Sequence, residues 1–159
     1  AAMGLTGLDS MDDFIEHNYR NYCQYLKELK NLPGLRMLRY SESEKCNYQY
    51  VVLEVDDTAS PLSRDELMTI LWAENVLARR YFYPGCHQME PYVSRFPDAA
   101  AGLPETEKLT HRVLVLPTGT SVGRPEIRLI CHIIRFALTR GAEVKERISE
   151  QNRLHPSGS

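Results

Sequence analysis

Several features that would place this chain in a special class of protein are missing from its sequence. The apolar run at residues 51–55 is far shorter than the ~20 residues that a membrane-spanning helix needs, and the N-terminus lacks the basic and then apolar pattern of a secretory signal. Nineteen Lys and Arg residues against twenty-one Asp and Glu residues leave a net charge of -2, so no basic excess is present to neutralise a nucleic-acid backbone. These absences argue against membrane and nucleic-acid partners and predict a cytoplasmic protein.

Two common kinds of cofactor or phosphate motif are also missing. The cysteines Cys23, Cys46, Cys86 and Cys131 form no C-x-x-C pair, which favours reduced thiols over disulfides or a zinc site. Residues 117–123 contain two glycines but lack the lysine and the spacing of a P-loop. We interpret this stretch as a turn into a helix, and an anion site built from its hydroxyls is the alternative.

The composition and the spacing of apolar residues predict one globular α/β domain. The chain has 159 residues, of which 43% are hydrophobic and 25% charged. Apolar spacing, the capping box Ser63-x-x-Glu66 and turn residues predict a helix at about 10–32, strands at 35–39 and 48–55, a helix at 63–75, a short strand from 76, a strand at 111–116, and helices at 125–141 and 142–154. This order predicts a small two-layer α/β sandwich whose helices pack on one face of a mostly antiparallel sheet.

Four prolines interrupt the segment between the last two predicted strands. Pro84, Pro91, Pro97 and Pro104 recur at a spacing that disfavours a long helix or a central strand. A compact domain rarely contains so long an irregular connection unless it lines a site or packs on another domain or subunit. We therefore expect residues 84–104 to be irregular and to be close to a site or an interface.

An aromatic stripe runs along the first predicted helix. Tyr19, Tyr22 and Tyr25 follow one another at three-residue spacing and so share one face. Such a stripe packs in a core or at an interface more often than it binds a cofactor, and we interpret it as an interface.

The densest candidate for chemistry is the stretch 78–92. It carries two arginines, three tyrosines and a histidine within fifteen residues. Arginine pairs with phosphates or carboxylates and aromatic rings stack on a base or a sugar, so the mixture suits a nucleotide sugar. The alternative is an amphipathic edge strand with buried rings and solvated arginines. Cys86 and His87 are neighbours whose side chains diverge on an extended chain, so we do not expect them to act as a nucleophile and its base.

Five stretches, taken in order, resemble the C-terminal part of DegT-type (DegT/StrS) sugar aminotransferases. They are residues 1–5 with Leu8, 31–35, 78–92, 103–107 and 113–117. The stretch Arg-Tyr-Phe-Tyr-Pro at 80–84, followed by His87 and Pro91-Tyr92, is the most specific of them. The resemblance covers nearly the whole chain. It also fits a chain that begins with Ala1 in a small-residue run rather than with methionine, as an internal segment of this family does.

The resemblance implies a fold-type I enzyme that depends on pyridoxal phosphate. Residues 1–154 would be the small C-terminal domain and residues 155–159 a tail, and a large domain outside this chain would hold the cofactor on a lysine. The reaction would move an amino group from glutamate to a nucleoside-diphosphate keto-deoxysugar, with C4 of a thymidine-diphosphate 4-keto-6-deoxyhexose indicated, although C3 aminotransferases share the framework. The family forms homodimers. The chain's lysines do not match the cofactor motif, so we expect the isolated chain to be inactive.

The resemblance also assigns substrate-proximal residues. Carried over position by position, it implies that Arg80, Tyr81, Phe82, Tyr83 and His87 position the sugar nucleotide without transferring protons. A different class of function is a self-standing, non-enzymatic α/β module that binds a nucleotide or a protein. Reading the gene upstream of the codon for Ala1 would separate the two, because only the enzyme requires a large domain with a lysine motif.

Overall fold

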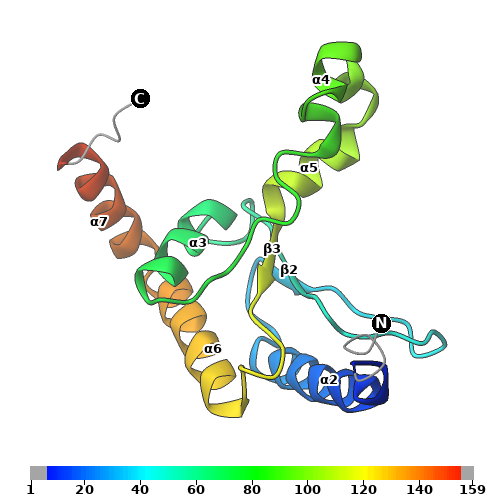
Figure 1. Ribbon diagram of the computed structural model, residues 1–159. Helices are drawn as coiled ribbons and strands as arrows, with labels where there is room; N and C mark the ends of the chain where they lie inside the picture. The colour runs from blue at the N-terminus through cyan, green and yellow to red at the C-terminus, as the bar shows by residue number, and fades with distance from the viewer. Residues whose placement is uncertain (1–6, 155–159) are drawn as a thin grey trace.

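The computed structural model describes residues 7–154, so the small-residue run at 1–5 and the tail at 155–159 lie outside the described residues. Its elements follow the chain in the order α2 (Met11–Glu28), β1 (Leu35–Met37), β2 (Val51–Val55), α3 (Arg64–Ala73), η1 (Cys86–Gln88), α4 (Tyr92–Arg95), η2 (Ala99–Gly102), α5 (Pro104–Arg112), β3 (Val113–Leu116), α6 (Arg124–Thr139) and α7 (Gly141–Leu154). Figure 1 shows a body formed by the sheet with α2, α3 and α6, and a helical projection that carries α4 and α5 away from it.

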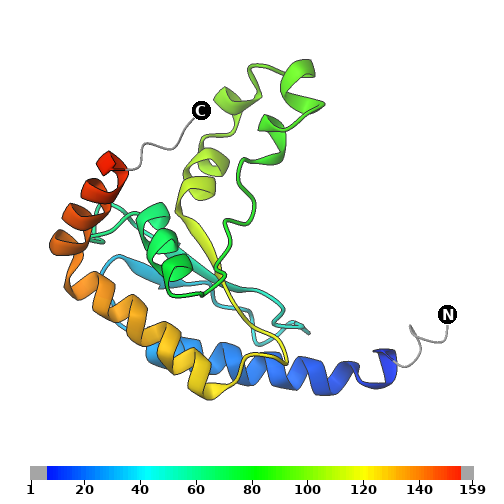
Figure 2. The same cartoon turned by 60° about the vertical axis from the view of Figure 1, so that its left-hand side comes forward.

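The sheet has three antiparallel strands in the order β1-β2-β3. Val51, Leu53 and Val55 alternate with less buried residues on β2, and Leu114 and Leu116 do so on β3, so each strand turns one apolar face inward. This face joins the apolar sides of α2, α3 and α6 in one core. The expected two-layer architecture, with helices on one face of an antiparallel sheet, is confirmed (Figure 2).

Local signals explain where two of the core helices begin. Ser63 caps α3 through the predicted capping box: its side chain accepts from the backbone N–H of Glu66, and the Glu66 carboxylate accepts from the N–H of Ser63. Pro125 lies in the first turn of α6, where the missing N–H has no helical partner to lose. Among residues 7–154, no helix is both long and apolar enough to cross a membrane.

The tyrosine stripe of α2 lies mostly inside the chain, so the interface interpretation is wrong for Tyr22 and Tyr25. Tyr25 is fully buried, and Tyr22 packs on Tyr40 and Tyr48, which belong to the long connection between β1 and β2. The Tyr22 hydroxyl also donates to the carbonyl of Leu38 over 3.1 Å. The stripe therefore anchors the β1–β2 connection to α2.

The segment expected to be irregular is instead a projecting arm, residues 81–112, built from short helices (Figures 1 and 2). As the proline spacing predicts, no long helix forms in the arm before residue 104, where η1, α4 and η2 have three or four residues each. Pro104 occupies the first turn of the nine-residue α5, and Pro91 precedes α4. The strand predicted from residue 76 is also wrong. Arg79 makes only an isolated bridge to Val115. His111 and Arg112 end α5 and do not begin β3.

Candidate functional site

Arg64 joins the arm to the body. It stands at the start of α3, is 2% exposed, and its Nη1 donates to the carbonyls of Thr110 over 2.9 Å and Val113 over 3.0 Å, where α5 passes into β3. Its Nε lies 2.7 Å from Asp65 Oδ1 as an ion pair without hydrogen-bond geometry. A buried guanidinium is costly unless its charge is matched, so its position beside two carbonyls and a carboxylate holds this junction in place.

A stack of charged and aromatic groups covers Arg64. The Tyr83 ring centre lies 5.2 Å from the guanidinium carbon of Arg64 and 4.8 Å from that of Arg80. Nη2 of Arg64 has no hydrogen-bond acceptor in residues 7–154, and the negative face of the Tyr83 ring compensates its charge. Arg80 Nη1 also lies 3.6 Å from Asp65 Oδ1, and His111 packs edge-on against Tyr83. These contacts join the segment that leads into the arm to the segment that returns from it.

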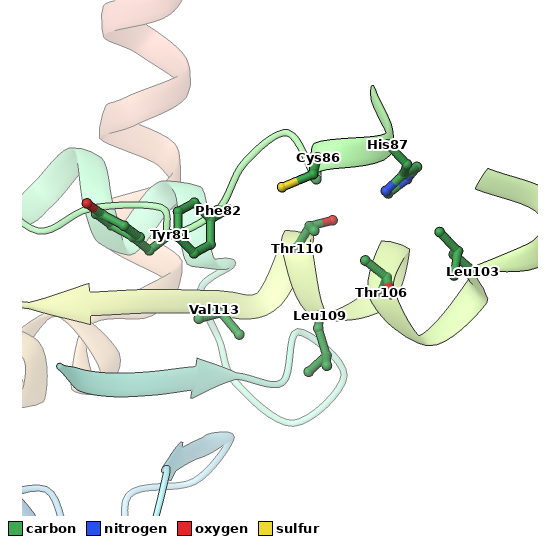
Figure 3. A pocket seen from close by; sticks show the side chains of 10 residues that line it. Tyr81, Phe82, Cys86, His87, Leu103, Thr106, Leu109, Thr110 and Val113 are labelled. Carbon is green, nitrogen blue, oxygen red and sulfur yellow. The ribbon is translucent and has the colours of Figure 1, made fainter. Parts of the chain in front are cut away.

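A cavity of about 490 Å³ lies between the two halves of the arm, beyond this stack. Tyr81, Phe82, Gly85, Cys86 and His87 line one side; Leu103, Thr106, Leu109, Thr110 and Val113 line the other. Figure 3 shows Tyr81 and Phe82 at one end and His87 with Leu103 at the other. The walls are largely apolar with a few hydroxyl and imidazole groups, which is the composition of a site for a small organic ligand.

His87 closes the far end of this cavity by bonding across the arm. Its Nε2 pairs with Oε1 of Glu107 on α5, and Gln88 Nε2 donates to both oxygens of the same carboxylate over 2.9 and 2.8 Å. The His87 ring also lies against Gly85, where an added Cβ would stand 2.6 Å from its Cε1. Glycine is therefore required at position 85 for the ring to take this place.

The five predicted site residues separate into two groups. Tyr81, Phe82 and His87 line the cavity, whereas Arg80 and Tyr83 form the stack with Arg64 outside the cavity lining. Cys86 and His87 lie in the short helix η1 rather than on an extended chain. Figure 3 nevertheless shows the Cys86 sulfur pointing toward Phe82 and the His87 ring toward α5. Their side chains diverge, as expected.

Sequence reasoning missed the wall contributed by α5 and the role of Arg64. Signals for α5 were present, because Pro104 is followed by Glu105 and Glu107 in the first turn and by His111 and Arg112 in the last, as the helix dipole favours. No local pattern predicts the burial of Arg64, because a charged residue in the first turn of a helix is normally solvated. Its burial depends on the return of the chain at Thr110 and Val113.

In the described part of the chain the metal-ligating side chains do not cluster, and the lysines lie apart from the cavity of the arm. No group of three or more metal-ligating side chains occurs among residues 7–154. The five lysines are all exposed and none lines a cavity described here; they are Lys27, Lys30, Lys45, Lys108 and Lys145. A Schiff-base lysine needs a pocket that encloses the cofactor, so these residues do not fit that role.

Several solved structures share the fold of this chain, aminotransferases among them. DesI, determined in the presence of its TDP-sugar product, superposes with a TM-score of 0.82 and 40% identity over 93% of this chain and 37% of DesI. Helicobacter pylori PseC, an aminotransferase of pseudoaminic acid biosynthesis, shares the fold alone, with a TM-score of 0.76 and 17% identity over 87% of this chain and 36% of its own.

Curated relatives and a family model agree with these structures. The dTDP-4-amino-4,6-dideoxy-D-glucose transaminase of Escherichia coli is 32% identical over 77 residues, which are 48% of this chain and 20% of that protein. The Shigella dysenteriae transaminase of the same name is 30% identical over 89 residues, 56% of this chain and 23% of its own. This chain thus spans about a fifth of these relatives. The model of the DegT/DnrJ/EryC1/StrS aminotransferase family matches residues 1–135, and the chain belongs to that family.

Proposed function

We propose that the protein to which this chain contributes is a pyridoxal-phosphate-dependent sugar aminotransferase, and that residues 1–154 form its small C-terminal domain, followed by the tail 155–159. The reaction transfers the amino group of glutamate to C4 of a thymidine-diphosphate 4-keto-6-deoxyhexose, with release of 2-oxoglutarate. The observation that carries the proposal is the likeness over 93% of this chain to DesI, a protein whose structure was solved with a TDP-sugar product. The names of the two curated relatives support the same substrate class.

The cavity of the arm suits one end of such a substrate. Phe82, 63% exposed, presents a ring that can stack on a base or a sugar, and the nearby imidazole of His87 is held by Glu107. Arg80 immediately precedes the arm and has 36% of its side chain exposed, so its guanidinium can still reach an anionic group. These groups bind and orient a ligand, and none of them forms a nucleophile and base pair.

The cofactor is held elsewhere in this proposal. Because the lysines of this chain are exposed and line no described cavity, a large domain supplies the Schiff-base lysine, and this chain supplies side chains that position the sugar nucleotide. The homodimer expected for the family gives the arm a partner. Phe82, Tyr92 and Phe96 are more than half exposed on it, and an apolar surface of this kind is normally covered in an assembly.

A product assay tests the proposed reaction. The protein that carries this chain together with its large domain is incubated with glutamate and thymidine-diphosphate 4-keto-6-deoxyglucose. We expect stoichiometric 2-oxoglutarate and a 4-amino sugar, identified by nuclear magnetic resonance. The 159-residue chain with added pyridoxal phosphate is the matched control and should form neither product. Amination at C3, or the absence of 2-oxoglutarate, would contradict the proposal.

A further inference from the structure

A second cavity, of about 370 Å³, shares Tyr81 with the cavity of the arm. It is bounded by the stretch that leads into the arm, by the end of the β1–β2 connection, and by residues 117–122, which follow β3. The polar and aromatic groups that line it are Gln49, Tyr50, Arg79, Tyr81, Thr118 and Ser121. Because Tyr81 lines both cavities, the two cavities are neighbours.

The charge of this second cavity is positive. Arg79 is among its lining residues and no acidic residue is, and Arg79 makes no ion pair within residues 7–154. Its backbone is fixed, because its N–H donates to the carbonyl of Val115 over 3.0 Å and its carbonyl accepts from the N–H of Val115 over 2.8 Å. By contrast, Arg64 and Arg80 share the Asp65 carboxylate. A guanidinium without a counter-ion beside a cavity favours an anionic ligand.

The loop that forms the opposite wall is held from behind by α2. The Tyr25 hydroxyl donates to the carbonyl of Pro117 over 2.9 Å, and Asn21 Nδ2 donates to that of Val122 over 2.9 Å. His17 Nε2 lies 3.1 Å from the carbonyl of Gly119. Asn21 and Tyr25 are buried, so the loop is anchored from within the core. A wall fixed in this way binds without a large cost of ordering.

The hydroxyls of this loop are available as donors. Thr118 Oγ1 accepts from Asn21 Nδ2 over 3.4 Å, which leaves its own O–H free to donate to a ligand. Ser121 is exposed and also lines the cavity. Tyr50 and Tyr81 pack with ring centres 5.6 Å apart and form an aromatic wall beside these donors. The Arg79 guanidinium, the hydroxyls of Thr118 and Ser121, and two tyrosine rings thus line the same cavity.

We propose that this second cavity is an anion subsite, in which Arg79 binds a phosphate or carboxylate group and the hydroxyls of Thr118 and Ser121 complete its hydrogen bonds. The identity of the anion rests on the proposed function. Its two substrates each carry a suitable anionic group, the diphosphate of the nucleotide sugar and a carboxylate of glutamate. The proposal of an anion subsite does not depend on which of the two groups binds, because the charged group and the hydrogen-bond donors are residues of this chain.

The test is a binding titration of the full 159-residue chain with three separate probes: thymidine diphosphate, glutamate and inorganic phosphate. Backbone amide signals of residues 118–122 report occupancy of the subsite. We expect Arg79→Gln to weaken binding of at least one probe tenfold or more and to abolish its shifts in that loop. Arg95→Gln is the matched control, because Arg95 is exposed on α4 and makes no ion pair within the described part of the chain. It should leave affinity unchanged.

The outcomes separate this inference from the proposed function. Arg79-dependent binding of thymidine diphosphate identifies the diphosphate as the anion, and Arg79-dependent binding of glutamate identifies the carboxylate. Arg79-dependent binding of inorganic phosphate without binding of thymidine diphosphate upholds the subsite while counting against the proposed substrate. If thymidine diphosphate shifts only the signals of Phe82, Cys86 and Leu109, with equal affinity in Arg79→Gln, the subsite is refuted and the proposed function stands. Absence of binding by all three probes at millimolar concentration also refutes it.

Discussion

Replacing Arg64 with methionine should destabilise the chain strongly. The substitution keeps a long side chain in the buried position but removes the two hydrogen bonds to the carbonyls of Thr110 and Val113, at 2.9 and 3.0 Å. A hydrogen bond from a charged donor contributes about 1.5–3 kcal/mol. Removing a buried guanidinium also relieves its desolvation, which offsets part of the loss. We expect the free energy of unfolding to fall by about 3 kcal/mol.

Urea denaturation measures this change, and Arg112→Met is the matched control. Arg112 stands at the end of α5 and pairs with Asp56 and Asp57, whose side chains are 43% and 62% exposed, so its loss should cost at most ~1 kcal/mol. Amide hydrogen exchange should show that Arg64→Met opens residues 104–113 before the rest of the chain. If Arg64→Met and Arg112→Met lower the unfolding free energy equally, the assignment of Arg64 as the anchor of the arm is refuted.

Three further predictions concern Gly34 and Cys131, which lie in the body of the fold. Gly34 has a φ of +71°, and an added Cβ would stand 2.3 Å from the backbone nitrogen of Ser60, so Gly34→Ala should lower the free energy of unfolding in urea by about 1–3 kcal/mol. In the control Gly102→Ala the added Cβ meets no atom within 4 Å, so the free energy of unfolding should change by less than ~0.5 kcal/mol. Equal effects of the two substitutions would contradict the close approach of Gly34 to Ser60. Burial raises the pKa of the Cys131 thiol to about 12, so at pH 8.5 iodoacetamide should label exposed Cys86 and spare Cys131 in the native chain. Because the folded state favours the neutral Cys131 thiol, the raised pKa stabilises the fold fully below pH 9, and this stabilisation is lost as the pH rises toward 12. Between pH 9 and 12 a Cys131→Ala variant should therefore lose less stability than the parent chain. Identical pH profiles of the two proteins would refute the raised pKa of Cys131.

The sequence predicts the body of this fold better than the arm, for a physical reason. The helices α2, α3, α6 and α7 and the strand β2 follow from apolar periodicity and end signals that act within a few residues. The arm depends on contacts between distant segments, such as the pairing of His87 with Glu107. The proline spacing predicts that no long helix crosses residues 84–104, but it does not reveal that Pro104 begins one, although proline is favoured in a first turn.

The same limit applies to the candidate site. Residues 80–87 could be singled out from composition and from the resemblance, because arginine, tyrosine and histidine crowd into one short stretch. Their separation into a cavity wall and a stack on Arg64 depends on α5 lying opposite residues 81–87. Local signals predict that α5 is a helix but not where it packs. Burial of Tyr22 likewise depends on Tyr40 and Tyr48, which are far from it in the sequence.

The central claim is that the arm, together with Arg80 at its base, positions the sugar nucleotide. The most direct measurement is the KM of the intact aminotransferase for that substrate in Arg80→Ala, with Arg95→Ala, on α4 of the arm, as the control. Loss of a charged hydrogen-bonding group amounts to about 1–3 kcal/mol, so we predict that Arg80→Ala raises KM roughly 5- to 150-fold with a smaller change in kcat, and that Arg95→Ala leaves both unchanged. An unchanged KM in Arg80→Ala, or an equal increase in both variants, would contradict the claim.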